Sequence, residues 1–128
     1  MIETIVEGFR RQRENYRRMA ELVAEERRLV ESADPDALLD LVRRQRAVLE
    51  EIRALDRTLH PVRARWPELR ARLDPAAAAR VEEEAARARR ALEDLLRRED
   101  EGGRGRQETA GAADAGRARA AYGGGAAW

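Results

Sequence analysis

The sequence predicts an all-α fold: an elongated antiparallel helical hairpin or three-helix bundle with coiled-coil character, followed by a flexible, Gly- and Ala-rich C-terminal tail. Apolar residues recur at alternating spacings of three and four over about the first hundred positions, as they do along one face of a helix. Charged residues make up 40% of the chain and aromatic residues 4%, a composition that opposes a β-sandwich. Two Asp-Pro pairs separate the apolar stretches, as at helix starts.

The first predicted helix covers about residues 2–31. Its apolar seam is interrupted only by Gln12 and Glu26. The full seam is Ile2, Ile5, Phe9, Gln12, Tyr16, Met19, Val23, Glu26 and Val30. At about 1.5 Å per residue, this helix is a rod of roughly 45 Å, so the domain is expected to be elongated.

The second predicted helix covers residues 35–73. Asp34 is placed to cap it, and Pro35 suits its first position. The seam is Leu38, Leu41, Gln45, Val48, Ile52, Leu55, Leu59, Val62, Trp66, Leu69 and Leu73. Pro61 and Pro67 lie within it, and because an interior proline costs on the order of 3 kcal/mol, they predict a kink or a break. The continuous apolar phase favours a kink or a short stagger over a loop.

The third predicted helix covers residues 75–100, with Asp74 as its cap, and completes a helical bundle of residues 1–100. Its seam is Ala78, Val81, Ala85, Ala88, Leu92 and Leu95. Residues 101–128 are rich in glycine, and each glycine lowers helicity by about 1 kcal/mol relative to alanine. These glycines predict a weakly structured tail. Tyr122 and Trp128 are its only large apolar residues, so the tail is a candidate for ordering only when it docks on a partner.

The motif RRQR occurs twice, at Arg10 to Arg13 and at Arg43 to Arg46. Gln12 and Gln45 fall on the seams, so the arginines lie on the helix flanks. Acidic residues one turn away are expected to pair with them: Glu7 with Arg11, Arg10 with Glu14, Glu14 with Arg18, Asp40 with Arg44, and Arg46 with Glu50. Solvated flanks are the favoured interpretation and polyanion binding the alternative. The formal net charge of only +1 opposes a nucleic-acid binder.

The sequence lacks the residues of a catalytic or metal site. It has no cysteine, one serine, Ser32, and one histidine, His60, so we expect no enzyme and no cofactor. His60 is interpreted as a partly exposed side chain beside the Pro61 kink. No apolar run approaches the roughly 20 residues that span a bilayer, and the N-terminus has acidic residues where a signal peptide is basic. We expect a cytoplasmic protein without membrane insertion.

The third helix offers a candidate surface, because small residues precede a leucine cluster formed by Leu92, Leu95 and Leu96. One interpretation is internal, in which this helix completes an ordinary three-helix core. The other is a groove for the amphipathic helix of a partner, since small residues permit close approach and leucines supply apolar area.

The arrangement of these helices resembles the FlgN-type flagellar export chaperones. The resemblance rests on the segment DPDALLDLVRRQRAVLEEIRAL and on the terminal Tyr-Gly of AYGGG. It implies a cytoplasmic helical chaperone that binds C-terminal helices of hook–filament junction proteins and delivers them to the flagellar type III export apparatus. The family binds partners through its C-terminal region, so the candidate partner-binding residues are Ala85, Ala88, Leu92, Leu95, Leu96 and Tyr122. Here Gly and Ala dilute this region after Asp100. The alternative is a self-associating coiled-coil structural or adaptor protein without a flagellar role.

Overall fold

The computed structural model describes residues 1–104, with side chains through Glu101. It contains four helices: α1 (Ile2–Ser32), α2 (Pro35–Ala64), α3 (Trp66–Arg72) and α4 (Pro75–Arg104). No strand occurs in this range, so the predicted all-α class is confirmed. The tail expected over residues 101–128 falls almost entirely outside the described residues.

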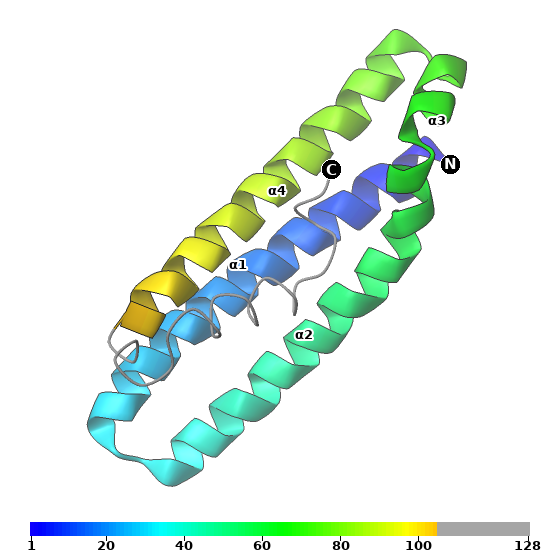
Figure 1. Ribbon diagram of the computed structural model, residues 1–128. Helices are drawn as coiled ribbons and strands as arrows, with labels where there is room; N and C mark the ends of the chain where they lie inside the picture. The colour runs from blue at the N-terminus through cyan, green and yellow to red at the C-terminus, as the bar shows by residue number, and fades with distance from the viewer. Residues whose placement is uncertain (105–128) are drawn as a thin grey trace.

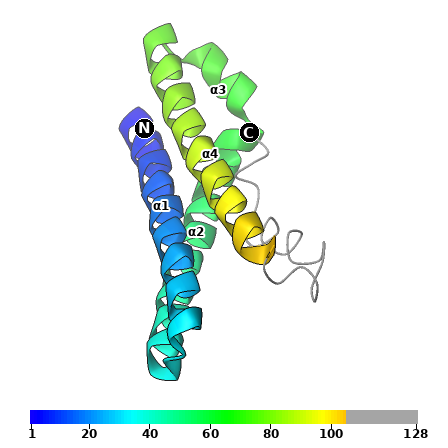
Figure 2. The ribbon, with the colours of Figure 1, turned by 90° about the vertical axis from the view of Figure 1, so that its left-hand side faces the viewer.

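Helix α1 is the middle element, with α2 on one side and α4 on the other (Figure 1). Helix α2 runs antiparallel to α1, whereas α4 runs parallel to it (Figure 2). Ion pairs agree with both directions: Glu25 near the end of α1 pairs with Arg44 near the start of α2, and Glu3 at the start of α1 pairs with Arg80 near the start of α4. Helix α4 packs along α1, and its backbone approaches that of α2 at hardly any point. The bundle is therefore a row of three long helices centred on α1.

Both Asp-Pro pairs act as the sequence predicts. The Asp34 carboxylate accepts a hydrogen bond from the Ala37 backbone N–H at 3.1 Å, and Pro35 occupies the first turn of α2. Ala33 makes the turn before it with a left-handed φ of 54°. At the start of α4 the Asp74 carboxylate accepts from the Ala76 N–H at 3.2 Å. Each cap satisfies a backbone donor that has no partner inside its helix.

The helix expected over residues 35–73, with a kink or a break near its prolines, is broken into two helices in the structure. Helix α2 continues through Pro61 and ends at Ala64. Arg65 leaves helical geometry, with φ −111° and ψ 16°, and Pro67 lies in the first turn of α3. A proline has no N–H for a continuing helix, but the first turn of a new helix does not need that donor. The break therefore coincides with the second proline, while α2 tolerates the first.

Helix α4 ends at Arg104, beyond the expected end at residue 100. Gly102 and Gly103 lie in its last turn. A cost of about 1 kcal/mol per glycine shifts the end of a long, packed helix only slightly.

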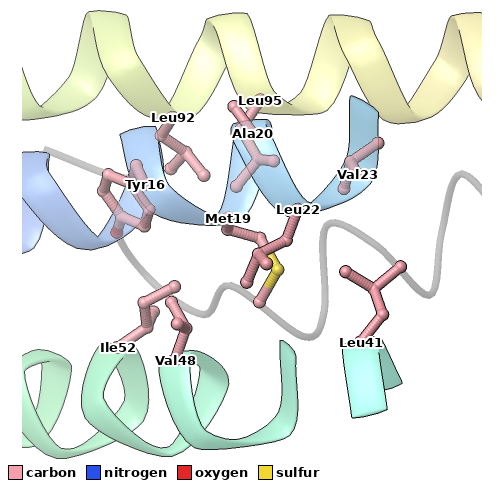
Figure 3. Close-up of a cluster of buried hydrophobic side chains, with 10 residues drawn as sticks. All are labelled: Tyr16, Met19, Ala20, Leu22, Val23, Leu41, Val48, Ile52, Leu92 and Leu95. Carbon is pink, nitrogen blue, oxygen red and sulfur yellow. The ribbon is translucent and has the colours of Figure 1, made fainter. Parts of the chain in front are cut away.

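The buried apolar side chains form two clusters along the row. The first lies at the N-terminal end of α1 and consists of Ile5, Val6, Phe9, Leu59, Val81, Ala85 and Ala88. The second lies toward the α1–α2 turn and consists of Tyr16, Met19, Ala20, Leu22, Val23, Leu41, Val48, Ile52, Leu92 and Leu95. Figure 3 shows its α2 and α4 members reaching α1 from opposite sides. The seams predicted from the sequence supply almost all of these residues.

The charged flanks pair differently from the prediction. Of the expected pairs within one helix, Asp40 with Arg44 is present at 2.9 Å. Arg10 and Arg18 instead form ion pairs across helices, with Glu84 at 3.4 Å and Glu51 at 3.8 Å. Residues that flank an apolar seam face the flanks of the neighbouring helix, so a partner there competes with one a turn away.

Candidate partner-binding surface

The candidate residues on α4, Ala85, Ala88, Leu92, Leu95 and Leu96, are called the α4 stripe here. The first four have exposed fractions of 3%, 3%, 1% and 0%, and all four belong to the core. Leu96 is half-buried at the edge of the second cluster. Tyr122 lies outside the described residues. In this conformation most of the α4 stripe therefore packs inside the bundle, and Leu96 is its accessible member.

The α4 stripe packs mainly against α1. Ala85 and Ala88 are small enough to let α4 approach α1 closely, and Leu92 and Leu95 then pack over α1 beside Tyr16 and Ala20 (Figure 3). The backbones of α2 and α4 approach each other at hardly any point, but Leu92 and Leu95 share their cluster with side chains of α2. Leu96 lies at the edge of this cluster, so it marks the flank of α4 that is partly accessible among the described residues.

A second apolar surface lies at the turn between α1 and α2, and the sequence analysis did not single it out. Val30, Leu39 and Val42 are 59%, 51% and 38% exposed, and we call them the hairpin-tip patch. The signal is the run ALLDLV, in which Leu39 and Val42 lie off the seam formed by Leu38 and Leu41. Large apolar side chains exposed near one end of a bundle are candidates for an interaction site.

Polar side chains separate the two apolar clusters. Gln12 is fully buried, and its side-chain N–H donates to the backbone carbonyl of Ile52 at 2.9 Å. Its side-chain carbonyl has no hydrogen-bond partner of normal geometry among the described residues, and neither does the nearby Tyr16 hydroxyl. Burial raises the pKa of Tyr16 to about 12; the Arg63 guanidinium opposes this shift and the Asp56 carboxylate adds to it. This layer links α1 to α2 through polar contacts.

Glu84 makes the corresponding link between α1 and α4. Its side chain is 7% exposed and lies 3.4 Å from Arg10, 3.9 Å from Arg13 and 3.2 Å from Arg87. At the start of the two helices, Arg80 hydrogen-bonds Glu3 and lowers the pKa of that exposed carboxyl. Burying the Glu84 carboxylate is costly unless positive charges lie beside it, as the three arginines do. Two of these, Arg10 and Arg13, belong to α1, so the contact requires the parallel alignment of α1 and α4.

The described residues contain neither a metal-binding cluster nor a membrane-spanning helix. No group of three His, Asp or Glu side chains within them is arranged to hold a metal ion. His60 lies exposed on α2, one residue before Pro61. None of the helices in the described part of the chain is long and apolar enough to cross a membrane.

Comparison with known protein families gives a match to the FlgN protein family over residues 1–101. The chain belongs to the FlgN family. The matched segment contains α1, α2 and α3 and nearly all of α4, so it coincides with the bundle described above. FlgN proteins are flagellar chaperones rather than enzymes, and the predicted resemblance is confirmed. No curated protein and no solved structure matched the chain.

Proposed function

We propose that this FlgN-type protein is a cytoplasmic chaperone of flagellar type III export. Its client is the C-terminal amphipathic helix of a hook–filament junction protein, which it holds unassembled before secretion and delivers to components of the export apparatus. Membership of the FlgN family supports the flagellar chaperone role. The client and the binding mode rest on the following argument.

The observation that carries the proposal is the half-buried Leu96 on α4. Leu92 and Leu95 pack inside the second cluster, whereas Leu96 lies at its edge, on a flank of α4 that stays partly accessible. A client helix packed along this flank buries Leu96 together with its own leucines. Each fully buried leucine contributes roughly 1.5 to 3 kcal/mol, so two or three anchors support micromolar binding after ordering costs.

The other members of the α4 stripe take part at a later stage in this proposal. Leu92 and Leu95 contact the client only if α4 moves away from α1, because both are covered in the described conformation. Ala85 and Ala88 then allow the client backbone to approach closely. Tyr122 extends the contact beyond the described residues.

Isothermal titration calorimetry of the full chain with a synthetic C-terminal peptide of a hook–filament junction protein tests the proposal. We expect binding with a negative heat-capacity change, the mark of apolar burial. L96E should weaken it by about tenfold or more, because a charge replaces an apolar contact at the interface. The matched control is L49E, since Leu49 is also half-buried at the edge of the second cluster but belongs to α2.

Two results would contradict the proposal. One is the absence of heat at peptide concentrations of about 0.5 mM, which corresponds to an interaction too weak for a chaperone. The other is an equal loss of affinity in L96E and L49E, which would mean that the client does not bind specifically at α4.

The hairpin-tip patch favours a second candidate, self-association as a structural or adaptor protein. Val30, Leu39 and Val42 are exposed together, and a second copy could cover them. Sedimentation velocity of the full chain separates the candidates. A stable dimer that V42E converts to monomer would support self-association, and a monomer over the same concentration range would oppose it.

A further inference from the structure

Beside the packed seam of α1 and α4 runs a shallow groove of about 600 Å³. We call it the arginine groove, because its charged walls are Arg13 and Arg17 of α1 and Arg87, Arg90 and Arg98 of α4. Its apolar members are Ala20 and Ala91. All its lining residues come from α1 and α4, so it is separate from the hairpin-tip patch.

The groove carries more positive charge than the chain as a whole. Five arginines face two carboxylates, Glu21 and Asp94, whereas the whole chain has a formal net charge of only +1. A second depression lined by Ala24, Arg27 and Arg97 shares Asp94 and Arg98 with the groove and continues it toward the end of α4. An anionic partner could therefore form charge-assisted contacts with several guanidinium groups at once.

Two of these arginine side chains have no ion-pair partner among the described residues. Arg13 and Arg87 contact Glu84, and Arg17 pairs with Glu14 at 3.3 Å. The side chains of Arg90 and Arg98 are exposed and form no ion pair with any residue in the range 1–101. They lie about 12 Å apart along α4, a little over two helical turns.

The spacing and composition of the groove fit a protein helix. Arg13 and Arg17 lie about one turn apart on α1, as Arg87 and Arg90 do on α4, and Arg98 follows about two turns after Arg90. Glutamates three or four residues apart on a partner helix repeat at about the same one-turn interval of 5 to 6 Å. Glu21 and Asp94 interrupt the basic walls and would repel the evenly spaced phosphates of a nucleic acid, whereas a protein helix can place neutral or basic residues opposite them. Ala20 and Ala91 leave room for a helix backbone.

We propose that the arginine groove is a docking site for an acidic helical segment of a partner protein. The site is distinct from the flank of α4 that carries Leu96, so the chaperone can hold this partner and a client together. The recognition chemistry is a set of charge-assisted contacts between carboxylates and guanidinium groups, centred on Arg90 and Arg98.

Fluorescence anisotropy with the full chain tests the proposal. The probe is a labelled, alanine-based helical peptide of about 18 residues, long enough to follow the groove, with glutamates at i, i+4, i+7 and i+11 on one face. The control probe has the same composition with its glutamates distributed around the helix. We expect the first probe to bind more tightly and to lose affinity steeply as salt rises.

The decisive variant is R90Q/R98Q, which should weaken binding of the one-faced probe by about tenfold through loss of two charge pairs. Its matched control is R53Q/R57Q, because Arg53 and Arg57 are also exposed and make no ion pair among the described residues but lie on α2. The control should stay within about twofold of the native chain. A91Q, which obstructs the groove without changing its charge, should also weaken binding, and circular dichroism checks that each variant is folded.

Three outcomes would overturn the proposal. They are no saturable binding at about 1 mM probe, equal losses in the two double variants, and tighter binding of a short oligouridylate RNA that R90Q/R98Q abolishes. The last outcome would make the groove a polyanion site. Binding of the junction-protein peptide is measured in parallel, so failure of the groove and failure of the client site are distinguishable.

Discussion

Replacing the buried Gln12 with leucine should stabilise the protein. Gln12 is fully buried, donates one hydrogen bond of 2.9 Å to the Ile52 carbonyl, and leaves its own side-chain carbonyl without a partner in the described part of the chain. The Ile52 carbonyl also accepts the regular i to i+4 bond inside α2, so it stays satisfied when the glutamine is removed. Leucine has a similar volume and fits the apolar seam.

The magnitude follows from two opposing terms. Losing the Gln12 hydrogen bond costs about 0.5 to 1.5 kcal/mol, and removing a buried acceptor without a partner recovers about 1 to 3 kcal/mol. The expected net gain for Q12L is about 1 kcal/mol. Q12A should instead destabilise the protein by about 2 kcal/mol, because the cavity it leaves outweighs the recovered term.

Urea unfolding followed by circular dichroism measures this change. With a slope of about 1 kcal/mol per M, Q12L should raise the midpoint by about 1 M at an unchanged slope. The control is Q45L at the second RRQR, where Gln45 is half-exposed and the change should stay within about 0.5 kcal/mol. A lower midpoint for Q12L than for the native protein would refute the reasoning, because it would mean that the single hydrogen bond outweighs the buried acceptor.

Two further predictions concern the polar contacts between helices. Because the pKa of Tyr16 is about 12 when folded and 10 when unfolded, the unfolded state loses its proton first, so stability present below pH 10 should fall as pH rises from 10 to 12. Y16F should show a smaller fall in unfolding free energy over that range, and equal pH dependence in the two proteins would contradict the assignment to Tyr16. E84Q should cost about 1 to 2 kcal/mol in thermal unfolding, because the carboxylate is 7% exposed among three arginines. E83Q removes an exposed carboxylate one residue away and should cost less than about 0.5 kcal/mol, and similar losses in both variants would count against a special role for Glu84.

The sequence by itself determined the three long helices and where they begin. Each Asp-Pro pair caps a helix through contacts with its own next few residues, and each seam follows from the 3.6-residue period, so both signals are local and readable without a fold. The all-α class and the core members of the seams followed from these signals. The location of the break at Arg65 did not, because two prolines six residues apart leave several breaks compatible with the same apolar phase.

Only the tertiary structure decided which face of each helix is covered and by which neighbour. The sequence pattern of the α4 stripe is the same for a helix face that packs on α1 and for one that binds a client. Its burial depends on the parallel placement of α4 on α1. The same placement gives Arg10 its partner on α4 and leaves Arg90 and Arg98 facing a groove. Periodicity is a property of one helix, whereas covering a face requires the position of a second helix, which lies far away in the chain.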